Sequence, residues 1–494
     1  MWLCMMVGMF DVTAPARWLV LGLAALLVAT APLIAPTVGR QSAAVSGSSR
    51  APVPGAAGIG DGYFPRDGNG GYQVQRYNVR IRYRLKSAEL AGSTVIRARA
   101  TQELSHLNVD FLLPVRRVRV NGRAARFSKP SRHELRITPR RTLAEGRRFT
   151  VKVWYAGKPD DVSYLGESNW LASRREVVTM NEPHMAPWWF PANDHPRDKA
   201  RMRLHITVPR GKQVIANGQL VRKTGKPGLT TWHWRSSEPM APYLAFFAAG
   251  DFEIRRGSTD GLPWLNAVSQ RLSPARQARS FQLLERTSEI DAWLVSEIGP
   301  YPFASTGGLV TNLKPGFALE NQTRPTYPYL GPGGLSTVVH EQAHQWFGND
   351  VSVDRWRDIW LSEGFATYFE VRYDETQGGG PSAEAWLRAQ YDSRPAGVEF
   401  WDLLIARPGP AELFSAPVYL RGAMTLVALR NRIGAEDLRT LLRSWFDQRS
   451  RGNGSTEDFI ALAEAISGAD LAEFFDAWLF TGAKPAQTAA NGLL

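Results

Sequence analysis

Near residue 255 the apolar residues of this chain change their spacing. Between about Tyr72 and Ile254 apolar and polar residues tend to alternate, as in Tyr72–Leu85, a pattern typical of half-buried strands. After about Arg255 the apolar residues recur at intervals of three and four, which is typical of amphipathic helices. Because these two spacings follow one another along the chain, we predict an α+β protein, with a β half followed by a mainly helical half.

The first half, predicted to span residues 61–255, contains several short strand-like segments. Those beyond the first are Phe149–Tyr155, Met202–Val208 and Thr230–Trp234. The pairs Asn121-Gly122 and Asn217-Gly218 predict tight hairpin turns, because both residue types readily adopt positive φ. Short strands separated by turns predict an antiparallel β-sandwich or saddle.

The second half is predicted to span residues 256–485, with a tail at 486–494. A short β segment at 308–313 lies among its predicted helices, which indicates a small sheet beside them. The segments with helical spacing are 276–298, 336–347, 361–376, 418–433, 435–446, 456–466 and 471–480.

Residues 1–60 are predicted to be a targeting segment followed by a flexible linker. Trp18–Val38 is a run of about twenty apolar residues without charge, preceded by Arg17. Ala29-Thr30-Ala31 is similar to a cleavage site, although Pro32 follows it directly. A cleaved signal peptide and an uncleaved membrane anchor both remain open, and both would export the rest of the chain; a buried core helix is the third alternative.

The amino-acid composition limits which partners the protein can bind and which residues can hold a metal. The formal net charge is +13, yet no nucleic-acid-binding motif is present, so we expect a solvated basic surface and no nucleic-acid partner. The hydrophobic and charged fractions, 44% and 21%, are those of a globular protein. Cys4 is the single cysteine, which excludes an intrachain disulfide and leaves histidine and carboxylate as the ligands for any metal.

His340-Glu341-Gln342-Ala343-His344 places two histidines four residues apart on a predicted helix. Side chains at this spacing stand on one face, so both imidazoles can reach one tetrahedral metal, and Glu341 is placed beside that metal as a general base. Composition alone would produce such a motif in on the order of one in a hundred chains of this kind.

Two further glutamates follow on the next predicted helix. Eighteen residues separate His344 from Glu363, which can supply the third ligand. Two histidines and one glutamate leave the fourth position of a zinc ion open, as in catalytic sites. Glu370, seven residues after Glu363, lies on the same helix face and is predicted to orient a ligand imidazole; a solvent-facing glutamate is the alternative.

These residues resemble the gluzincin aminopeptidase family, which includes aminopeptidase N and leukotriene hydrolase. The resemblance continues through His344–Asn349 and Trp356–Tyr368 and extends over most of the chain. It implies a thermolysin-like catalytic domain, one zinc ion, and hydrolysis of the N-terminal bond of peptides with a free N-terminus. It also implies a short form of the family, in which the C-terminal helical domain of many relatives is absent and the cleft is more open.

The resemblance assigns roles to residues outside the zinc motif. Phe317-Ala318-Leu319-Glu320-Asn321 is similar to the family's Gly-Ala-Met-Glu-Asn exopeptidase motif, with Phe in place of Gly and Leu in place of Met. By that match Glu320, with Asn321 beside it, binds the substrate's free α-amino group. The segment Asn181-Glu182-Pro183 implies a second amino-anchoring carboxylate at Glu182. Tyr419, in a segment similar to the family's Tyr-x-Lys-Gly-Ala, would donate a hydrogen bond to the oxyanion.

Three other functions share parts of this pattern. A zinc endopeptidase would use the same metal ligands without the anchoring carboxylates, and a non-catalytic binding module would keep the scaffold alone. An epoxide hydrolase would need a lipid-shaped tunnel. We expect a monomeric, exported metallo-aminopeptidase that is secreted or anchored to a membrane through its apolar segment, and we expect His184 and His195 to be structural.

Overall fold

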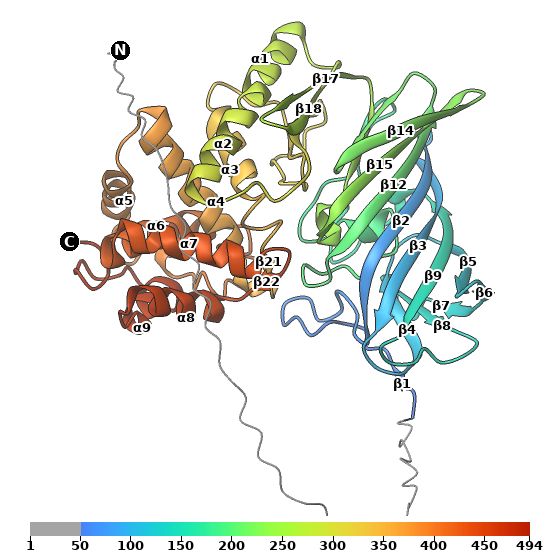
Figure 1. Ribbon diagram of the computed structural model, residues 1–494, viewed down its shortest axis with the longest axis horizontal. Helices are drawn as coiled ribbons and strands as arrows, with labels where there is room; N and C mark the ends of the chain where they lie inside the picture. The colour runs from blue at the N-terminus through green and yellow to red at the C-terminus, as the bar shows by residue number, and fades with distance from the viewer. Residues whose placement is uncertain (1–50) are drawn as a thin grey trace, which may run out of the picture. The chain divides into compact units, whose positions relative to one another are not determined.

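The computed structural model describes residues 51–494 of the chain (Figure 1). The apolar segment 18–38, which the sequence predicts to be a targeting signal, lies outside these residues. Within residues 51–494, no helix combines the length and apolar character needed to cross a membrane.

An eight-stranded sheet forms the centre of the first half. Along β2 the side chains alternate between buried and exposed, as the sequence pattern predicts, so one face of the sheet lies on the core. All neighbouring strands are antiparallel except β2 and β12, which are parallel. The strand order is β14 (Gln219–Lys226), β15 (Leu229–Met240), β12 (Ala200–Pro209), β2 (Tyr72–Arg84), β3 (Glu89–Ala100), β9 (Arg148–Gly157), β5 (Val115–Val120) and β6 (Arg123–Ala124).

Two four-stranded sheets share an apolar core with it. This confirms the predicted β-rich first half. The first sheet contains, in order, β1 (Val53–Pro54), β4 (Leu104–Asp110), β8 (Glu134–Thr138) and β7 (Arg126–Ser128). The second contains β10 (Leu171–Ala172), β11 (Val177–Val178), β16 (Phe247–Gly250) and β13 (Gln213–Ala216).

Of the two predicted hairpins, one is confirmed and the other is wrong. Asn121 and Gly122 join the paired strands β5 and β6 with φ of 47° and 77°, as a primed turn requires. Asn217-Gly218 instead joins β13 to β14, which belong to different sheets. Asn217 is buried there, where its amide donates to the carbonyls of Leu244 and Gln322, so the pair fixes a crossing between sheets.

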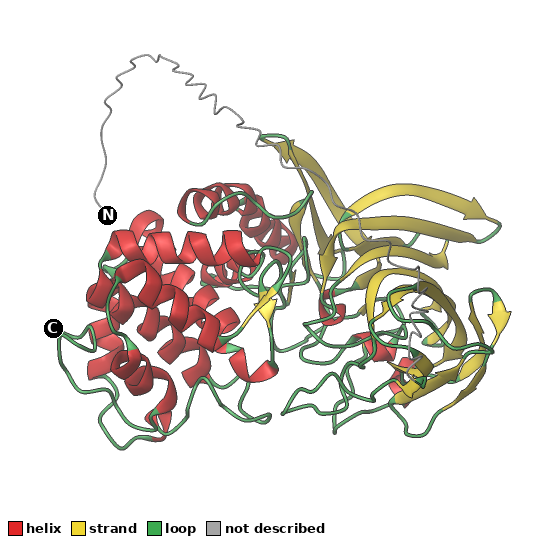
Figure 2. Cartoon of the chain, turned by 60° about the horizontal axis from the view of Figure 1, so that its bottom comes forward, coloured by secondary structure: helices red, strands yellow, loops and turns green. Residues whose placement is uncertain are grey.

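The second half is mainly helical, as predicted, and Figure 2 shows its helices gathered apart from the strands of the first half. The segment predicted as one helix over 276–298 is two helices, separated at Arg286, whose N–H donates to the Leu283 carbonyl oxygen three residues back. The helices are α1 (Pro274–Glu285), α2 (Thr287–Glu297), α3 (Gly334–Ala343), α4 (Trp360–Tyr373), α5 (Ala383–Asp392), α6 (Ala416–Ile433), α7 (Ala435–Arg449), α8 (Thr456–Ser467) and α9 (Ala472–Phe475).

Two small sheets accompany these helices. One contains the predicted β segment. Its strands, in order, are β17 (Phe252–Thr259), β18 (Leu262–Ser269), β19 (Thr306–Val310) and β20 (Thr326–Tyr327). The other pairs β21 (Ser352–Val353) with β22 (Asn453–Gly454) in parallel.

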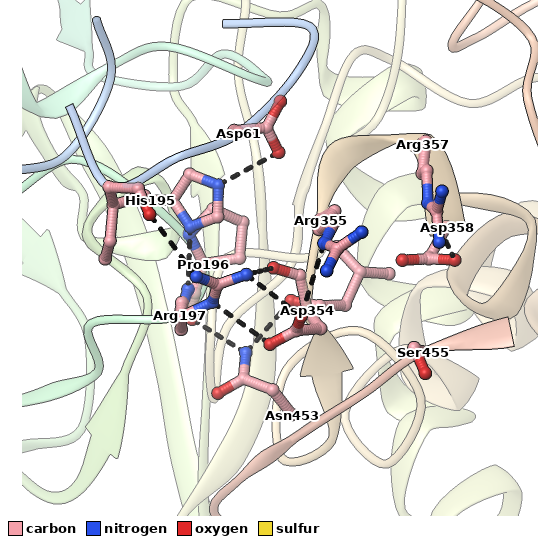
Figure 3. Close-up of polar contacts among 12 residues, drawn as sticks. Asp61, His195, Pro196, Arg197, Asp354, Arg355, Arg357, Asp358, Asn453 and Ser455 are labelled. Carbon is pink, nitrogen blue, oxygen red and sulfur yellow. Dashed lines mark hydrogen bonds and ion pairs between the residues drawn. The ribbon is translucent and has the colours of Figure 1, made fainter. Parts of the chain in front are cut away.

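A short segment before β12 connects the two halves (Figure 3). Arg197 donates from Nε and Nη2 to the carboxylate of Asp354, at 3.0 and 2.9 Å. His195 Nε2 lies 3.2 Å from Asp61 Oδ2, an oxygen that also accepts from the backbone N–H of Trp356. The structure therefore gives His195 a structural position, and it ties the β-rich half to the loop that precedes α4.

Lys199 completes this connection from a buried position. Its Nζ donates to the carbonyl oxygens of Asn349, Asp350 and Gly452, at 3.0, 2.7 and 2.7 Å. Asn349 and Asp350 belong to the loop that follows α3, so a residue of the β-rich half holds the segment just after the two motif histidines.

Candidate metal centre and cleft

Three side chains from two helices converge on one point. His340 lies in the last turn of α3, His344 directly follows that helix, and Glu363 lies in the first turn of α4. The two Nε2 atoms are 3.0 Å apart, and Glu363 Oε2 lies 3.3 and 3.4 Å from them. Ligands of a tetrahedral zinc ion with bonds of 2.0–2.1 Å are separated by about 3.3 Å, so this set fits zinc.

The other nitrogen of each imidazole is held by a protein acceptor. His340 Nδ1 donates to Glu370 Oε1 at 2.6 Å, and His344 Nδ1 donates to the carbonyl oxygen of Phe347 at 3.0 Å. Both Nε2 atoms are thereby directed at the shared point, which is how outer partners of zinc histidines fix the ring orientation. The structure thus places Glu370 beside a ligand imidazole, with its second oxygen accepting from Ser336.

The charge of the third ligand is set by the two histidines. Burial alone would raise the pKa of Glu363, but His344 and His340 lower it to about 2. Glu363 is therefore a carboxylate at neutral pH, which is the form that can bind a metal ion.

Glu341 extends from α3 into the cleft that contains His340, His344 and Glu363. It is buried, and its Oε2 has no hydrogen-bond partner within residues 51–494. Burial raises the pKa of Glu341 to about 8, although the neighbouring His340 and His344 oppose the rise. A carboxylate with one free oxygen and a raised pKa is suited to accept and return a proton.

Two more carboxylates share the cleft with the zinc ligands. Tyr243 donates its hydroxyl to Glu320 Oε1 at 2.9 Å, and both residues are buried. Burial and then the negative charges of Glu320 and Glu363 raise the pKa of Glu182 well above its usual range. Several buried carboxylates in one cleft repel one another, so the cleft favours positively charged groups.

The backbone of Glu320 is held by residues just after the zinc motif. Asn349 Nδ2 donates to the Glu320 carbonyl oxygen at 2.7 Å, and Gln345 Nε2 donates to the same oxygen at 3.2 Å. The position of the loop that carries Glu320, relative to the segment just after the two motif histidines, is thus fixed by direct hydrogen bonds. No pattern in the sequence marks Tyr243, because a tyrosine in the segment Ala241-Pro242-Tyr243 belongs to no chemical motif.

An aromatic side chain from a third helix covers the metal ligands. Tyr419, in the first turn of α6, lies with its ring centroid 5.9 Å from that of His340 and nearly parallel to it, at 23°. Burial first, and nearby carboxylates second, raise the pKa of Tyr419 well above its usual range. Its hydroxyl therefore keeps its proton and can act as a hydrogen-bond donor.

The candidate metal ligands, the other glutamates described above and Tyr419 line one cleft of about 440 Å³. Phe317 and Phe414 form an apolar part of its wall and are 41% and 38% exposed, so they are open to a substrate side chain. The lining residues are Asn181, Glu182, Phe317, Ala318, Leu319, Glu320, Thr337, His340, Glu341, His344, Glu363, Glu370, Phe414 and Tyr419.

Asn321 is the one sequence-predicted site residue that the structure does not bring into this cleft. Its side chain is fully buried, and its Nδ2 donates to the carbonyl oxygen of Leu244 at 3.2 Å. We correct its expected contact with substrate to a contact that holds the loop carrying Glu320.

Comparison with known proteins gives matches over both halves. The model of the peptidase M1 N-terminal domain matches residues 73–244, and the model of the peptidase family M1 domain matches residues 334–478. Aminopeptidase M1-B of Oryza sativa subsp. japonica is 28% identical over 337 residues, which make up 64% of this chain and 37% of that protein. The chain thus spans little more than a third of the length of that curated relative.

Two solved structures match over most of their own length. One is a mutant M1 zinc metallopeptidase of Deinococcus radiodurans, described as bound to a Tyr-Ser-Ala substrate. It has a TM-score of 0.75 and 26% identity, and the match covers 85% of this chain and 97% of that one. The other is a mutant of a two-domain M1 zinc metallopeptidase bound to L-arginine, with a TM-score of 0.77, 27% identity and the same coverage.

Proposed function

The chain belongs to peptidase family M1, the gluzincin aminopeptidases, and from this membership and the geometry of its cleft we propose that it is a zinc-dependent aminopeptidase. The observation that carries the proposal is the joint position of the zinc ligands and of two anchoring carboxylates, Glu182 and Glu320, in one cleft. The similar metallopeptidase described with a Tyr-Ser-Ala substrate supports a peptide as the substrate, and the two anchoring carboxylates support a free N-terminus on that peptide.

We assign one zinc ion to this cleft, held by His340, His344 and Glu363. Zinc bound there supplies Lewis acidity toward a peptide carbonyl and lowers the pKa of water. The protein provides the remaining steps. Glu320 and Glu182 bind the substrate's α-ammonium by charge-assisted hydrogen bonds and so bring the first peptide bond to the metal ligands.

Proton transfer and charge stabilisation come from two further side chains. The free Oε2 of Glu341 accepts a proton from the attacking water and returns it to the leaving amine. The Tyr419 hydroxyl donates a hydrogen bond to the carbonyl oxygen as negative charge develops on it.

The proposal is tested by comparing fluorogenic aminoacyl amides that carry a free or an acetylated N-terminus. We expect turnover of the free substrates alone, and its loss on chelation with recovery on added Zn²⁺. Glu341→Gln should remove turnover while the zinc content stays at that of the natural chain. Absence of turnover on every substrate by a zinc-loaded chain would refute the proposal.

A zinc endopeptidase is distinguished by the anchoring carboxylates. For an aminopeptidase, Glu320→Ala should reduce kcat/KM on free aminoacyl amides by about 100-fold or more, as the loss of a buried charge partner predicts. Cleavage of N-acetylated peptides that survives Glu320→Ala would favour the endopeptidase. Zinc content without any turnover would favour a non-catalytic binding module.

We further propose that the chain acts outside the cytoplasm as a monomer. The uncharged apolar segment Trp18–Val38 supports export, either with a cleaved signal or with a membrane anchor. Expression of the full chain followed by fractionation should locate activity outside the cytoplasmic fraction, and deletion of residues 1–38 should retain it inside. Light scattering of the purified chain gives its molar mass in solution and so tests whether it is a monomer.

A further inference from the structure

A second group of metal-ligand side chains lies in the β-rich half. Asp110 ends β4, Glu134 begins β8, and His133 immediately precedes it. Each offers one ligand atom, and these atoms all lie within 4.8 Å of one another. All three residues are buried, with 4% exposure or less, so the group is unlike the solvated acidic clusters of protein surfaces.

His133 is the member that a purely structural role leaves unexplained. It is 2% exposed, and neither ring nitrogen has a hydrogen-bond partner within residues 51–494. The ring stacks on Tyr164 with centroids 4.0 Å apart, which fixes its plane, and Nδ1 lies 3.8 Å from Asp110 Oδ1. A buried imidazole that makes no hydrogen bond is costly, because both nitrogens lose their water.

Two of the carboxylates around His133 retain a free oxygen, whereas both oxygens of Asp110 accept hydrogen bonds. Asp110 accepts from Asn69 Nδ2 and from the backbone N–H groups of Gly68 and Asp194, so it has a structural role as well. Glu134 Oε1 and Asp194 Oδ2, however, are buried and have no partner within the described part of the chain.

The nearby cations are engaged elsewhere. Lys129 Nζ donates to the carbonyl oxygens of Phe111 and Leu112. His184 contacts Asp67 and Glu167. Within residues 51–494, no lysine or arginine lies within 4.0 Å of the carboxylates of Asp110, Glu134 or Asp194. No lysine or arginine of the described residues therefore forms a direct ion pair with this cluster.

We propose that Asp110, His133 and Glu134 bind a second divalent cation, separate from the zinc of the cleft. One imidazole nitrogen with carboxylate oxygens is a donor set that Zn²⁺ and Mn²⁺ accept, whereas Ca²⁺ prefers oxygen ligands alone. The cation would join β4 to β8. Through Asp194, whose N–H donates to Asp110, it would also stabilise the segment that connects the two halves.

The test counts the cations bound by the natural chain and by a variant whose catalytic metal site has been removed. The full chain and a His344→Ala/Glu363→Gln variant are stripped with a chelator and dialysed against Zn²⁺, Mn²⁺ or Ca²⁺, and bound metal is measured by mass spectrometry. We expect two equivalents of Zn²⁺ in the natural chain and one equivalent of Zn²⁺ or Mn²⁺ in the variant. Adding His133→Gln and Glu134→Gln should remove the last equivalent, whereas adding His106→Gln, a partly exposed histidine of β4, should not.

The proposal is overturned if the catalytic-site variant binds no Zn²⁺ or Mn²⁺, if it binds Ca²⁺ alone, or if the equivalent survives loss of His133 and Glu134. Should these last substitutions prevent folding, X-ray absorption of the metal in the catalytic-site variant decides. Coordination of the metal by one imidazole and by carboxylate oxygens supports the site, and coordination without an imidazole refutes it. Because the catalytic zinc is removed beforehand, the outcome is independent of peptidase activity.

Discussion

Gly364 of α4 directly faces Gly422 of α6, and a methyl group on Gly364 would lie 2.8 Å from the Cα of Gly422. The two helices therefore cross at backbone contact. Glu363 precedes one glycine, and Tyr419 lies on the same helix as the other. The glycine pair thus sets the separation between Glu363 and Tyr419.

Gly364→Ala should impair catalysis by forcing these helices apart. Overpacking of this kind costs about 1–3 kcal/mol, and the contact is with backbone, which cannot rotate away. We expect kcat to fall by at least about 10-fold, because displacements near 1 Å in a catalytic set have effects of this size. Gly225→Ala is the matched control, since a Cβ there meets nothing within 4 Å. Equal activity of the two variants would show that the crossing does not position Tyr419.

Glu370→Gln should weaken zinc binding without changing the fold. The substitution removes the negative charge beside His340 Nδ1, and loss of such outer partners typically reduces metal affinity by about 10- to 100-fold. Competition with a chromophoric chelator measures the affinity, and circular dichroism checks the fold. Glu473→Gln, at an exposed glutamate, serves as the control. An unchanged zinc affinity would mean that Glu370 does not orient the imidazole.

Tyr243→Phe should weaken recognition of the free N-terminus. The hydroxyl donates to Glu320, and a hydrogen bond to a charged group contributes about 1.5–3 kcal/mol, or roughly 10- to 100-fold in kcat/KM. We expect most of the loss in KM for free aminoacyl amides. Tyr391→Phe is matched in kind, since its hydroxyl donates to the Pro485 carbonyl oxygen outside the cleft lining, and it should leave KM unchanged. A similar KM in both variants would contradict the role.

The zinc set and the two-part fold could be predicted from sequence because each rests on a local period. The spacing of His340 and His344 places both rings on one helix face, and the change of period near residue 255 separates strands from helices. The domain boundaries at 61–255 and 256–485 stay predictions.

What the sequence could not supply are contacts between distant segments. Nothing local indicates that Tyr243 reaches Glu320, or that Asn217-Gly218 joins two sheets, because an Asn-Gly pair has the same backbone preferences in either setting. Likewise, the burial that leaves His133 without a partner arises only when β4 and β8 pair.

Lys199→Met should destabilise the whole described fold. The substitution removes the Nζ donor from three carbonyl oxygens. Those of Asn349 and Gly452 still accept from Ser352, but that of Asp350 has no other donor within residues 51–494, and an unmet buried group costs about 1–3 kcal/mol. We expect the free energy of unfolding, measured in urea, to fall by about 2 kcal/mol. Arg197→Met removes the neighbouring ion pair, which is about a third exposed, and should cost only about 1 kcal/mol. The reverse order would show that the connection depends on the ion pair.

The stability of the protein should fall as pH rises above about 6.5, because of His184. Burial alone would lower the pKa of His184, but the carboxylates of Asp67 and Glu167, which accept from its two ring nitrogens, raise it to about 10. Below pH 6.5 the imidazole is protonated in both the folded and the unfolded chain, so its contribution is fully present there. Between pH 6.5 and about 10 the unfolded chain releases the proton while the folded chain keeps it, and the contribution is lost progressively.

The His184 contribution is isolated by a difference measurement. A raised pKa of this size corresponds to a few kcal/mol at most, because each pKa unit is worth about 1.4 kcal/mol. The free energy of unfolding of the natural chain minus that of His184→Gln, both freed of metal, should decrease steadily from pH 6.5 to 9. A difference that stays constant over this range would mean that His184 is neutral in the folded protein, and that Asp67 and Glu167 are held there by other cations.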